Sequence, residues 1–171
     1  MHQLFSLDKL STKQTPFYYY DTALLKETLQ AIKTEIEPYE RFQVHYAVKA
    51  NANAKLLNII SKAGLEADCV SGGEILAAID AGFSPNKIVY AGVGKSDWEI
   101  ALGIDQEILC FNVESIAELE VINEIAEQKG KIARIALRIN PDVEAHTHAN
   151  ITTGLAENKF GIALCEMKTA L

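Results

Sequence analysis

The chain has 171 residues, a formal net charge of -7 and 49% hydrophobic residues, which is enough apolar material for one ordinary domain with a core. Its 23% charged residues, 4 Pro and 10 Gly exclude a disordered or collagen-like chain. The acidic balance without clustered Lys and Arg argues against nucleic-acid binding, and no segment approaches the roughly 20 apolar residues of a membrane span.

The N-terminal residues lack a basic region followed by an apolar run and a small-residue cleavage site, so we expect a cytoplasmic protein without a membrane anchor. Residues 17–20 (FYYY) predict a short strand that closes an N-terminal strand segment, residues 1–20. Asp21 then suits a helix N-cap. A stripe at helical spacing predicts a helix that Pro38 closes; it consists of Leu25, Leu29, Ile32 and Ile36.

In residues 42–49 apolar and other side chains alternate, which predicts a strand with Lys49 at its carboxyl end. Strand-like and helix-like segments then alternate at roughly 20 to 28 residues per unit. The further predicted strands are residues 65–70, 88–91, 108–111 and 132–139. The predicted helices are residues 53–62, a segment that Gly82 ends, a segment from Asp97, and one that Gly130 ends.

This alternation demands an α/β fold with parallel strands under covering helices. An open doubly wound sheet and a (β/α)₈ barrel both fit. No G-x-G-x-x-G follows the first strand, so we favour the barrel. Because a whole barrel needs about 250 residues, we expect residues 21–171 to form an incomplete barrel of its N-terminal five or so units, with an unclosed edge.

Three side chains near predicted carboxyl strand ends, where barrel enzymes build their sites, are the main candidates for chemistry. Lys49 ends an apolar strand, where desolvation would lower its pKa and make the amine a nucleophile, or where it would simply reach solvent. Asp68 could orient that amine or lie in an exposed turn. Arg138 lies in an apolar run and needs an anionic or phenolic partner, whether a ligand or a structural one.

Other motifs have simpler interpretations. The three cysteines lack CxxC spacing, and Cys69 and Cys110 read as buried free thiols. Residues 92–96 (GVGKS) lack the first glycine of a phosphate-binding loop, because position 89 is Val. Residues 71–73 open a helix and could meet an anion or form a plain turn. His146 and His148 lack an evident third ligand, so we predict no metal site.

Five motifs, in order, resemble the barrel-type pyridoxal-phosphate decarboxylases, whose barrel is of the alanine-racemase type. They are HYAVKAN at 45–51, DCVSGGE at 68–74, GVGKS at 92–96, RINPD at 138–142, and the loop HTHANITTG at 146–154 with NKFG at 158–161. That loop is most similar to the family members that decarboxylate meso-2,6-diaminopimelate to L-lysine and carbon dioxide, the last step of lysine biosynthesis. The resemblance covers nearly the whole chain.

The resemblance implies that Lys49 binds pyridoxal 5′-phosphate covalently, with Asp68 beside its amine and Arg138 beside the cofactor ring. Glu74 would help to hold the turn after Asp68. It also implies a small amino-acid substrate and a homodimer in the complete protein. Alternatives of the same fold are an ornithine, arginine or carboxynorspermidine decarboxylase, or a non-catalytic relative that keeps the cofactor.

Family members run to roughly 400 residues, so the resemblance also implies parts beyond Leu171. These are a ring-stacking His, a glycine-rich phosphate loop, a Glu that pairs with the pyridine nitrogen, and a C-terminal β domain with a Cys that reaches the partner's active site. We therefore expect an enzyme fragment that is inactive alone.

Overall fold

The computed structural model describes residues 10–141 and 160–171. The chain divides into two compact units, residues 1–42 and 43–171. The first contains helix α2, Thr22–Ile36, which begins where predicted because the Asp21 carboxylate accepts hydrogen bonds from the next backbone amides. This helix groups with the N-terminal unit, residues 1–42.

The strand predicted for residues 17–20 is wrong. An extended segment becomes a strand only when its backbone pairs with a neighbouring strand, and every strand in the described part of the chain pairs within the second unit. The aromatic side chains of this segment are exposed, and the rings of Tyr18 and Tyr20 stack with centroids 6.3 Å apart.

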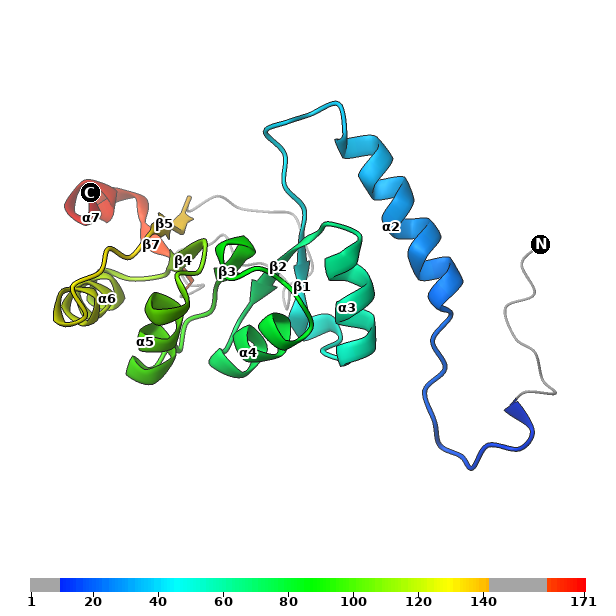
Figure 1. Cartoon of the computed structure of the whole chain (residues 1–171). Coiled ribbons are helices and arrows are strands. Elements are labelled where there is room, and N and C mark those ends of the chain that lie inside the picture. The colour runs from blue at the N-terminus through cyan, green and yellow to red at the C-terminus, as the bar shows by residue number, and fades with distance from the viewer. Residues whose placement is uncertain (1–9, 142–159) are drawn as a thin grey trace. The chain divides into compact units, whose positions relative to one another are not determined.

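The second unit is built on a five-stranded parallel sheet with strand order β1-β2-β3-β4-β5. The strands are β1 (His45–Ala47), β2 (Glu66–Cys69), β3 (Ile88–Tyr90), β4 (Cys110–Val113) and β5 (Ile135–Leu137). The helices that alternate with them are α3 (Ala54–Lys62), α4 (Gly72–Asp80), α5 (Asp97–Gln106) and α6 (Ile116–Gln128). Figure 1 shows these four helices along one side of the sheet. In a barrel the strands follow one another in chain order and the helices cover one face, as they do here. In a doubly wound sheet the strand order reverses and helices cover both faces.

Several strands are shorter than predicted. β1 ends at Ala47, where the chain turns into a 3-10 helix, Val48–Ala50, that contains Lys49. β4 begins at Cys110 because the Ile108 amide donates to the Gly103 carbonyl and so still closes the end of α5. These differences arise where helix ends and strand ends compete for the same backbone groups.

The strand predicted for residues 132–139 divides at Arg138. β5 pairs with β4, and β6 (Ile139–Asn140) pairs instead with β7 (Ile162–Ala163) in a separate parallel ladder. β7 leads through a 3-10 helix, Leu164–Glu166, into α7, Met167–Ala170. The chain beyond Arg138 therefore gains a further parallel neighbour, β7, which begins at Ile162.

The sheet has one face that the helices cover and one open face. Residues paired across neighbouring strands point to the same face, so the side chains divide into two sets. Side chains at most 1% exposed pack toward the helices; they are Ala67, Cys69, Ile88, Tyr90, Phe111 and Val113. Gly103 of α5 marks this contact, since an added Cβ would lie 2.7 Å from the Phe111 ring. The alternate residues are half-buried or exposed; they are Asp68, Val89, Cys110, Asn112, Ala136 and Arg138. This second set forms what we call the inner face.

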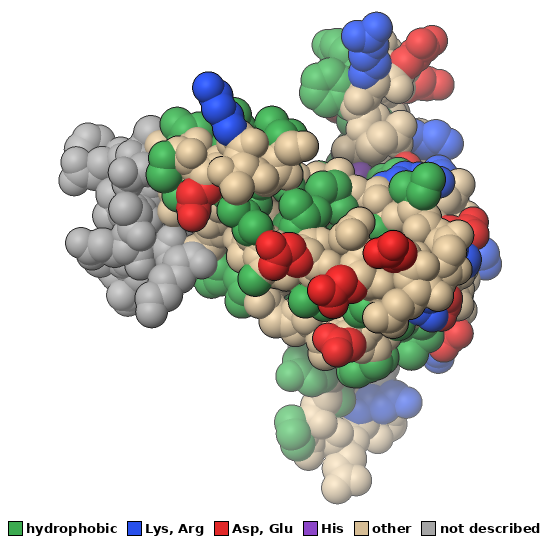
Figure 2. All heavy atoms as spheres, turned by 90° about the vertical axis from the view of Figure 1, so that its left-hand side faces the viewer, with side chains coloured by type: hydrophobic (Ala, Val, Ile, Leu, Met, Phe, Trp, Pro, Cys, Tyr) green, Lys and Arg blue, Asp and Glu red, His purple; other side chains and the backbone are tan. Residues whose placement is uncertain are grey.

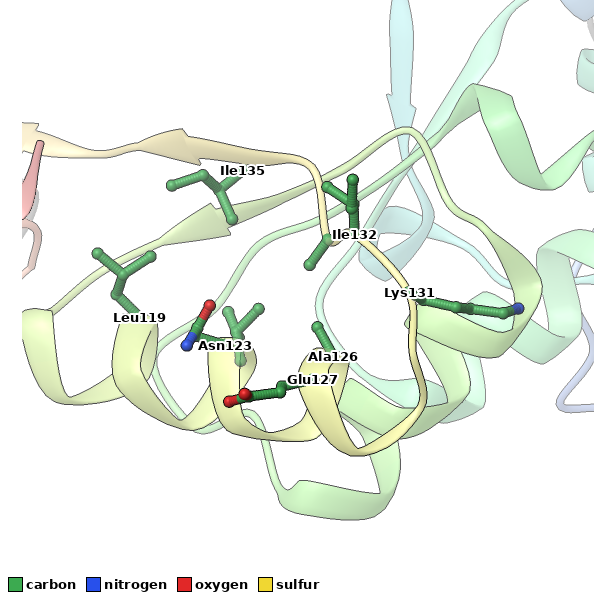
Figure 3. Close-up of a pocket in the computed structure, with 9 residues that line it drawn as sticks. Leu119, Asn123, Ala126, Glu127, Lys131, Ile132 and Ile135 are labelled. Atoms are coloured by element: carbon green, nitrogen blue, oxygen red, sulfur yellow. The ribbon is translucent and has the colours of Figure 1, made fainter.

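An apolar groove of about 460 Å³ lies between α6 and the segment that leads into β5. In Figure 3, Leu119 and Ala126 of α6 point toward Ile135 and Ile132, while Lys131 points away from them. Ile132 is 94% exposed. Figure 2 shows hydrophobic side chains lying between acidic ones on this side of the molecule. No helix in the described ranges is long and apolar enough to cross a membrane.

The groove and the inner face predict that residues 1–171 alone will self-associate, because five or six barrel strands leave a sheet face and an edge unpaired. Size-exclusion chromatography with light scattering of the isolated chain should show oligomers or aggregates. A monomer that melts cooperatively would contradict this expectation.

Candidate active site at the carboxyl ends of the strands

Lys49 lies just beyond the carboxyl end of β1, in the 3-10 helix, and its side chain is exposed. Of the two alternatives that the sequence left open for this amine, the structure shows the one in which it reaches solvent. The strand stops at Ala47, two residues earlier than expected. The amine can be reached by a ligand that approaches from the open side.

Asp68 lies on the neighbouring strand, directly across from Ala47 and so close to the start of the Lys49 turn. Its side chain is half-buried, and Oδ1 is buried without a hydrogen-bond partner among the described residues. A buried carboxylate oxygen without a partner is costly and indicates a group that accepts a bond from a ligand or a moving side chain. The exposed-turn alternative for Asp68 is therefore wrong.

Cys69, the next residue, points to the helical side and is fully buried. Burial, together with the nearby carboxylates of Glu74 and Asp68, raises the pKa of its thiol to about 12. The predicted buried free thiol is confirmed for Cys69. Cys110 is only half-buried, and burial raises its pKa as well.

The turn after β2 is held by carboxylates of this chain. Glu74 Oε2 accepts from the Val70 amide at 2.8 Å, and the Glu74 amide donates to Ser71 Oγ at 3.2 Å. The Gly72 amide, which the sequence left open as an anion-binding group, donates to Glu99 Oε1 at 2.7 Å. The anion at this helix start is thus a side chain from α5, and Glu74 holds the turn as the resemblance implied.

Glu99 is a buried acid with several hydrogen bonds. Burial, the largest single effect, would raise its pKa, but hydrogen bonds from the Gly72 amide and from the Ser96 amide and hydroxyl lower the pKa to about 2. Burial and the charge of Glu99 in turn raise the pKa of Tyr90. Glu99 therefore ties the starts of α4 and α5 together as an ionised group.

Arg138 leaves the sheet between β5 and β6 and is 44% exposed at its side chain. Its Nη1 donates to Glu114 Oε1 at 2.9 Å, and its guanidinium lies over the Phe160 ring, 5.3 Å from the centroid. The predicted anionic partner is Glu114. Gly161 has φ +86, and an added Cβ would come within 2.9 Å of the Arg138 carbonyl oxygen. Glycine is required there so that β7 can approach Arg138.

Lys95 is a buried cation that the sequence interpretation did not use. Its side chain is 1% exposed, and Nζ donates to the Gly92 and Asn112 carbonyls at 2.7 and 2.8 Å and to Glu118 Oε1 at 2.6 Å. The ammonium also lies 5.3 Å from the centre of the Tyr90 ring. Lys95 joins the carboxyl ends of β3 and β4 to α6, and all these bonds turn it away from any phosphate-binding role.

One pattern in the sequence would have found these acids. Ser-x-x-Glu occurs at 71–74, 96–99 and 115–118, each time just after a strand. This is the capping-box spacing, in which the acid reaches back to free backbone amides at the helix start. Glu74, Glu99 and Glu118 each do so. Glu114 has no such signal, because only the fold brings Arg138 to it.

The candidate residues fall into two groups on the inner face. Lys49 and Asp68 lie at β1 and β2, and Arg138 lies three strands along from β2. A cavity of about 360 Å³ beside Arg138 is lined by Ala91, Asn112, Glu114, Ala136, Leu137 and Arg138. His146, His148 and the rest of the HTHANITTG motif lie outside the described residues, as do Asn158 and Lys159 of the NKFG motif.

Comparison with known protein families shows which family the chain belongs to. Residues 22–171 match the family described as pyridoxal-dependent decarboxylase, pyridoxal binding domain. The chain belongs to this family. The resemblance inferred from the five motifs is confirmed, and the cofactor of the domain is pyridoxal 5′-phosphate, as expected.

The chain is also similar to individual proteins of this family. The chain is 66% identical to diaminopimelate decarboxylase of Bacteroides thetaiotaomicron, over 98% of this chain and 43% of that protein. It is 47% identical to the diaminopimelate decarboxylase of Aquifex aeolicus, over 94% of this chain and 38% of that protein. The chain therefore spans about two fifths of the length of these relatives.

Solved structures agree with the fold. Diaminopimelate decarboxylase of Helicobacter pylori complexed with L-lysine superposes with a TM-score of 0.88 at 41% identity, and covers 96% of this chain and 41% of that one. An arginine decarboxylase of Paramecium bursaria Chlorella virus gives a TM-score of 0.69 at 28% identity, over 86% and 37%. The predicted incomplete barrel is confirmed.

The residues present fit pyridoxal 5′-phosphate on the evidence of their own chemistry. An aldehyde needs a reachable amine, and Lys49 is exposed beside the inner face. The buried, unpartnered Asp68 oxygen on the next strand can accept a hydrogen bond from a group that binds there. The Arg138 guanidinium, exposed on the same face, keeps donors for a ligand while it bonds to Glu114.

Replacing Gly161 with Ala should displace Arg138 and destabilise the protein. The left-handed backbone costs about 1–2 kcal/mol for a side chain, and the clash with the Arg138 carbonyl adds to it. Gly130→Ala is the matched control, because Gly130 has φ +61 but nothing within 4 Å of an added Cβ. Chemical denaturation should show a larger loss for Gly161→Ala; equal losses would show that the close approach to Arg138 is unimportant.

Glu99 should make stability depend on acid. Because its folded pKa of about 2 lies below the usual 4.5, its contribution is present above pH 4.5 and is lost as the pH falls toward 2. Glu99→Gln should therefore lose less stability than the wild type between pH 5 and pH 3, as measured by urea midpoints. Glu107→Gln, on the surface, should behave like the wild type; a Glu99→Gln curve parallel to the wild type would refute the assignment.

Proposed function

We propose that this chain is the N-terminal part of a pyridoxal-phosphate-dependent decarboxylase that converts meso-2,6-diaminopimelate to L-lysine and carbon dioxide. The observation that carries the proposal is an exposed Lys49 just past the end of β1, together with a buried, unpartnered Asp68 oxygen on the neighbouring strand β2. The 66% identity to the Bacteroides diaminopimelate decarboxylase supports the choice of substrate.

Each residue has a role that follows from its place. Lys49 would hold the cofactor through its amine, the group that the amine of the substrate would replace. Asp68 accepts a hydrogen bond from that amine and so keeps it oriented. Arg138 would hold the cofactor from the other end of the inner face. When bound, the cofactor supplies an electron-accepting ring that takes up the electron pair left by the departing carbon dioxide.

Other features of the complete protein also belong to this proposal. The family resemblance supports a homodimer in which a cysteine from one subunit reaches the other's active site. A cytoplasmic location is part of the same proposal. The phosphate-binding loop, the ring-stacking His and the acid that pairs with the pyridine nitrogen are expected in the part of the protein that follows Leu171.

Lys49 should be the residue that the cofactor modifies. Borohydride reduction of the full-length protein with pyridoxal 5′-phosphate, followed by peptide mapping, should place the pyridoxyl mass on Lys49 and leave Lys55 unlabelled. Both lysines are exposed, so exposure alone would label them equally. A label on Lys55 or Lys95 in place of Lys49 would sink the assignment.

The full-length protein should release carbon dioxide from meso-diaminopimelate and not from the L,L isomer, because attack at the D-configured centre is what leaves L-lysine. Residues 1–171 alone should not turn over, since productive chemistry needs the cofactor held in one orientation. Carbon dioxide release is measured for both proteins, with L-arginine and L-ornithine as competing substrates. Faster turnover of arginine or ornithine than of meso-diaminopimelate would show that the proposed substrate is wrong.

A further inference from the structure

We propose that Glu114 is a positioning residue that fixes the Arg138 guanidinium on the inner face, and that Lys95 and Glu118 hold Glu114 in place. This inference rests on the proposed function, because Arg138 acts there beside the cofactor ring. It assigns a role to a buried group of side chains that neither catalysis nor helix capping explains.

The first contact joins a buried acid to an exposed base. The Glu114 side chain is 4% exposed and that of Arg138 44%, and Oε1 accepts from Nη1 at 2.9 Å. The two backbones are joined as well, because the Arg138 amide donates to the Val113 carbonyl at 2.9 Å. Glu114 therefore holds one edge of the guanidinium, while the remaining donors face the cavity that both residues line.

Glu114 is in turn fixed from behind. Its amide donates to Glu118 Oε2 at 2.9 Å, and the other Glu118 oxygen accepts from Lys95 Nζ at 2.6 Å. Lys95 is itself held by two backbone carbonyls, one after β3 and one on β4. Contacts thus run without a break from the end of β3, through α6, to Arg138.

Helix capping does not account for this cluster. The turn after β2 has the same bond, from the Val70 amide to Glu74, without any buried lysine among the described residues. A buried ammonium is expensive to desolvate, so its presence needs a reason beyond the cap. In α6 that reason is a rigid mount for Glu114.

Glu114 also lacks a purpose other than Arg138. Its second oxygen, Oε2, is buried without a hydrogen-bond partner in the described ranges. Its first oxygen bonds to Arg138 alone among the side-chain contacts found there. Burying a carboxylate in this way destabilises the fold. This cost indicates that the role of Glu114 is to position the Arg138 guanidinium.

A double-mutant cycle in the full-length protein tests the proposal. The dissociation constant of pyridoxal 5′-phosphate is measured by titrating the cofactor-free protein, for Glu114→Gln, Arg138→Met and the double variant. Losing a charged hydrogen bond predicts about tenfold weaker cofactor binding for Glu114→Gln. Because Glu114 acts through Arg138, the double variant should bind no more weakly than Arg138→Met alone. Effects that multiply in the double variant would overturn the proposal.

Controls separate positioning from stability and from the proposed function. Glu107→Gln removes an exposed acid that pairs with Lys131 at 3.4 Å, and its cofactor binding should equal that of the wild type. A Glu114→Gln protein with a lower melting temperature but unchanged cofactor binding would show a merely structural role and refute the inference. If Glu114→Gln does not fold, Glu114→Asp, which keeps the charge but is one methylene shorter, takes its place in the same cycle.

The titration of the wild-type protein separates a failure of the proposed function from a failure of the role proposed for Glu114. A wild-type protein that does not bind the cofactor would refute the proposed function, and this inference with it. A wild type that binds, with Glu114→Gln binding equally well, would refute this inference alone. Lys95→Met should weaken binding in the same direction as Glu114→Gln, and only when Arg138 is intact; an effect that persists with Arg138→Met would show that Lys95 acts elsewhere.

Discussion

Successive residues of a strand point to opposite faces of the sheet. Because the strands β1 to β5 pair in parallel register, the same two sets of side chains continue across the whole sheet. One set of side chains, from Ala67 to Val113, is buried under the helices and fixes the sheet. The other set is thereby directed to the inner face. Asp68, Asn112 and Arg138 share that face because hydrophobic burial of their neighbours leaves them no alternative.

The carboxyl edge of the sheet concentrates charge that the fold must stabilise. Glu99 is held by amides and hydroxyls at two helix starts, and Glu118 by the buried Lys95. These acids use their bonds to join neighbouring units, so the turns that present Asp68 and Arg138 become rigid. A site whose residues come from different strands needs such cross-links, because a small misplacement of one group weakens catalysis strongly.

Much of this was predictable from the sequence. Alternating apolar patterns gave the order of strands and helices, and Asp21, Asn53 and Ser71 marked helix starts by their capping chemistry. The strand at residues 17–20 failed because periodicity does not reveal whether a pairing partner exists. The local pattern left the exposure of Lys49 open for a related reason: exposure depends on strand length and barrel closure, which a local pattern does not contain. Glu114 and Lys95 were out of reach, since their partners are far away in the sequence.

The most direct test of the account is a crystal structure of the full-length protein with pyridoxal 5′-phosphate. It should show the cofactor carbon bonded to Lys49 Nζ at the carboxyl ends of the strands, the ring between the positions of Asp68 and Arg138, and Glu114 still bonded to the guanidinium. A cofactor bound elsewhere, as in the groove beside α6, or an Arg138 that has left Glu114 to pair with another group, would contradict it.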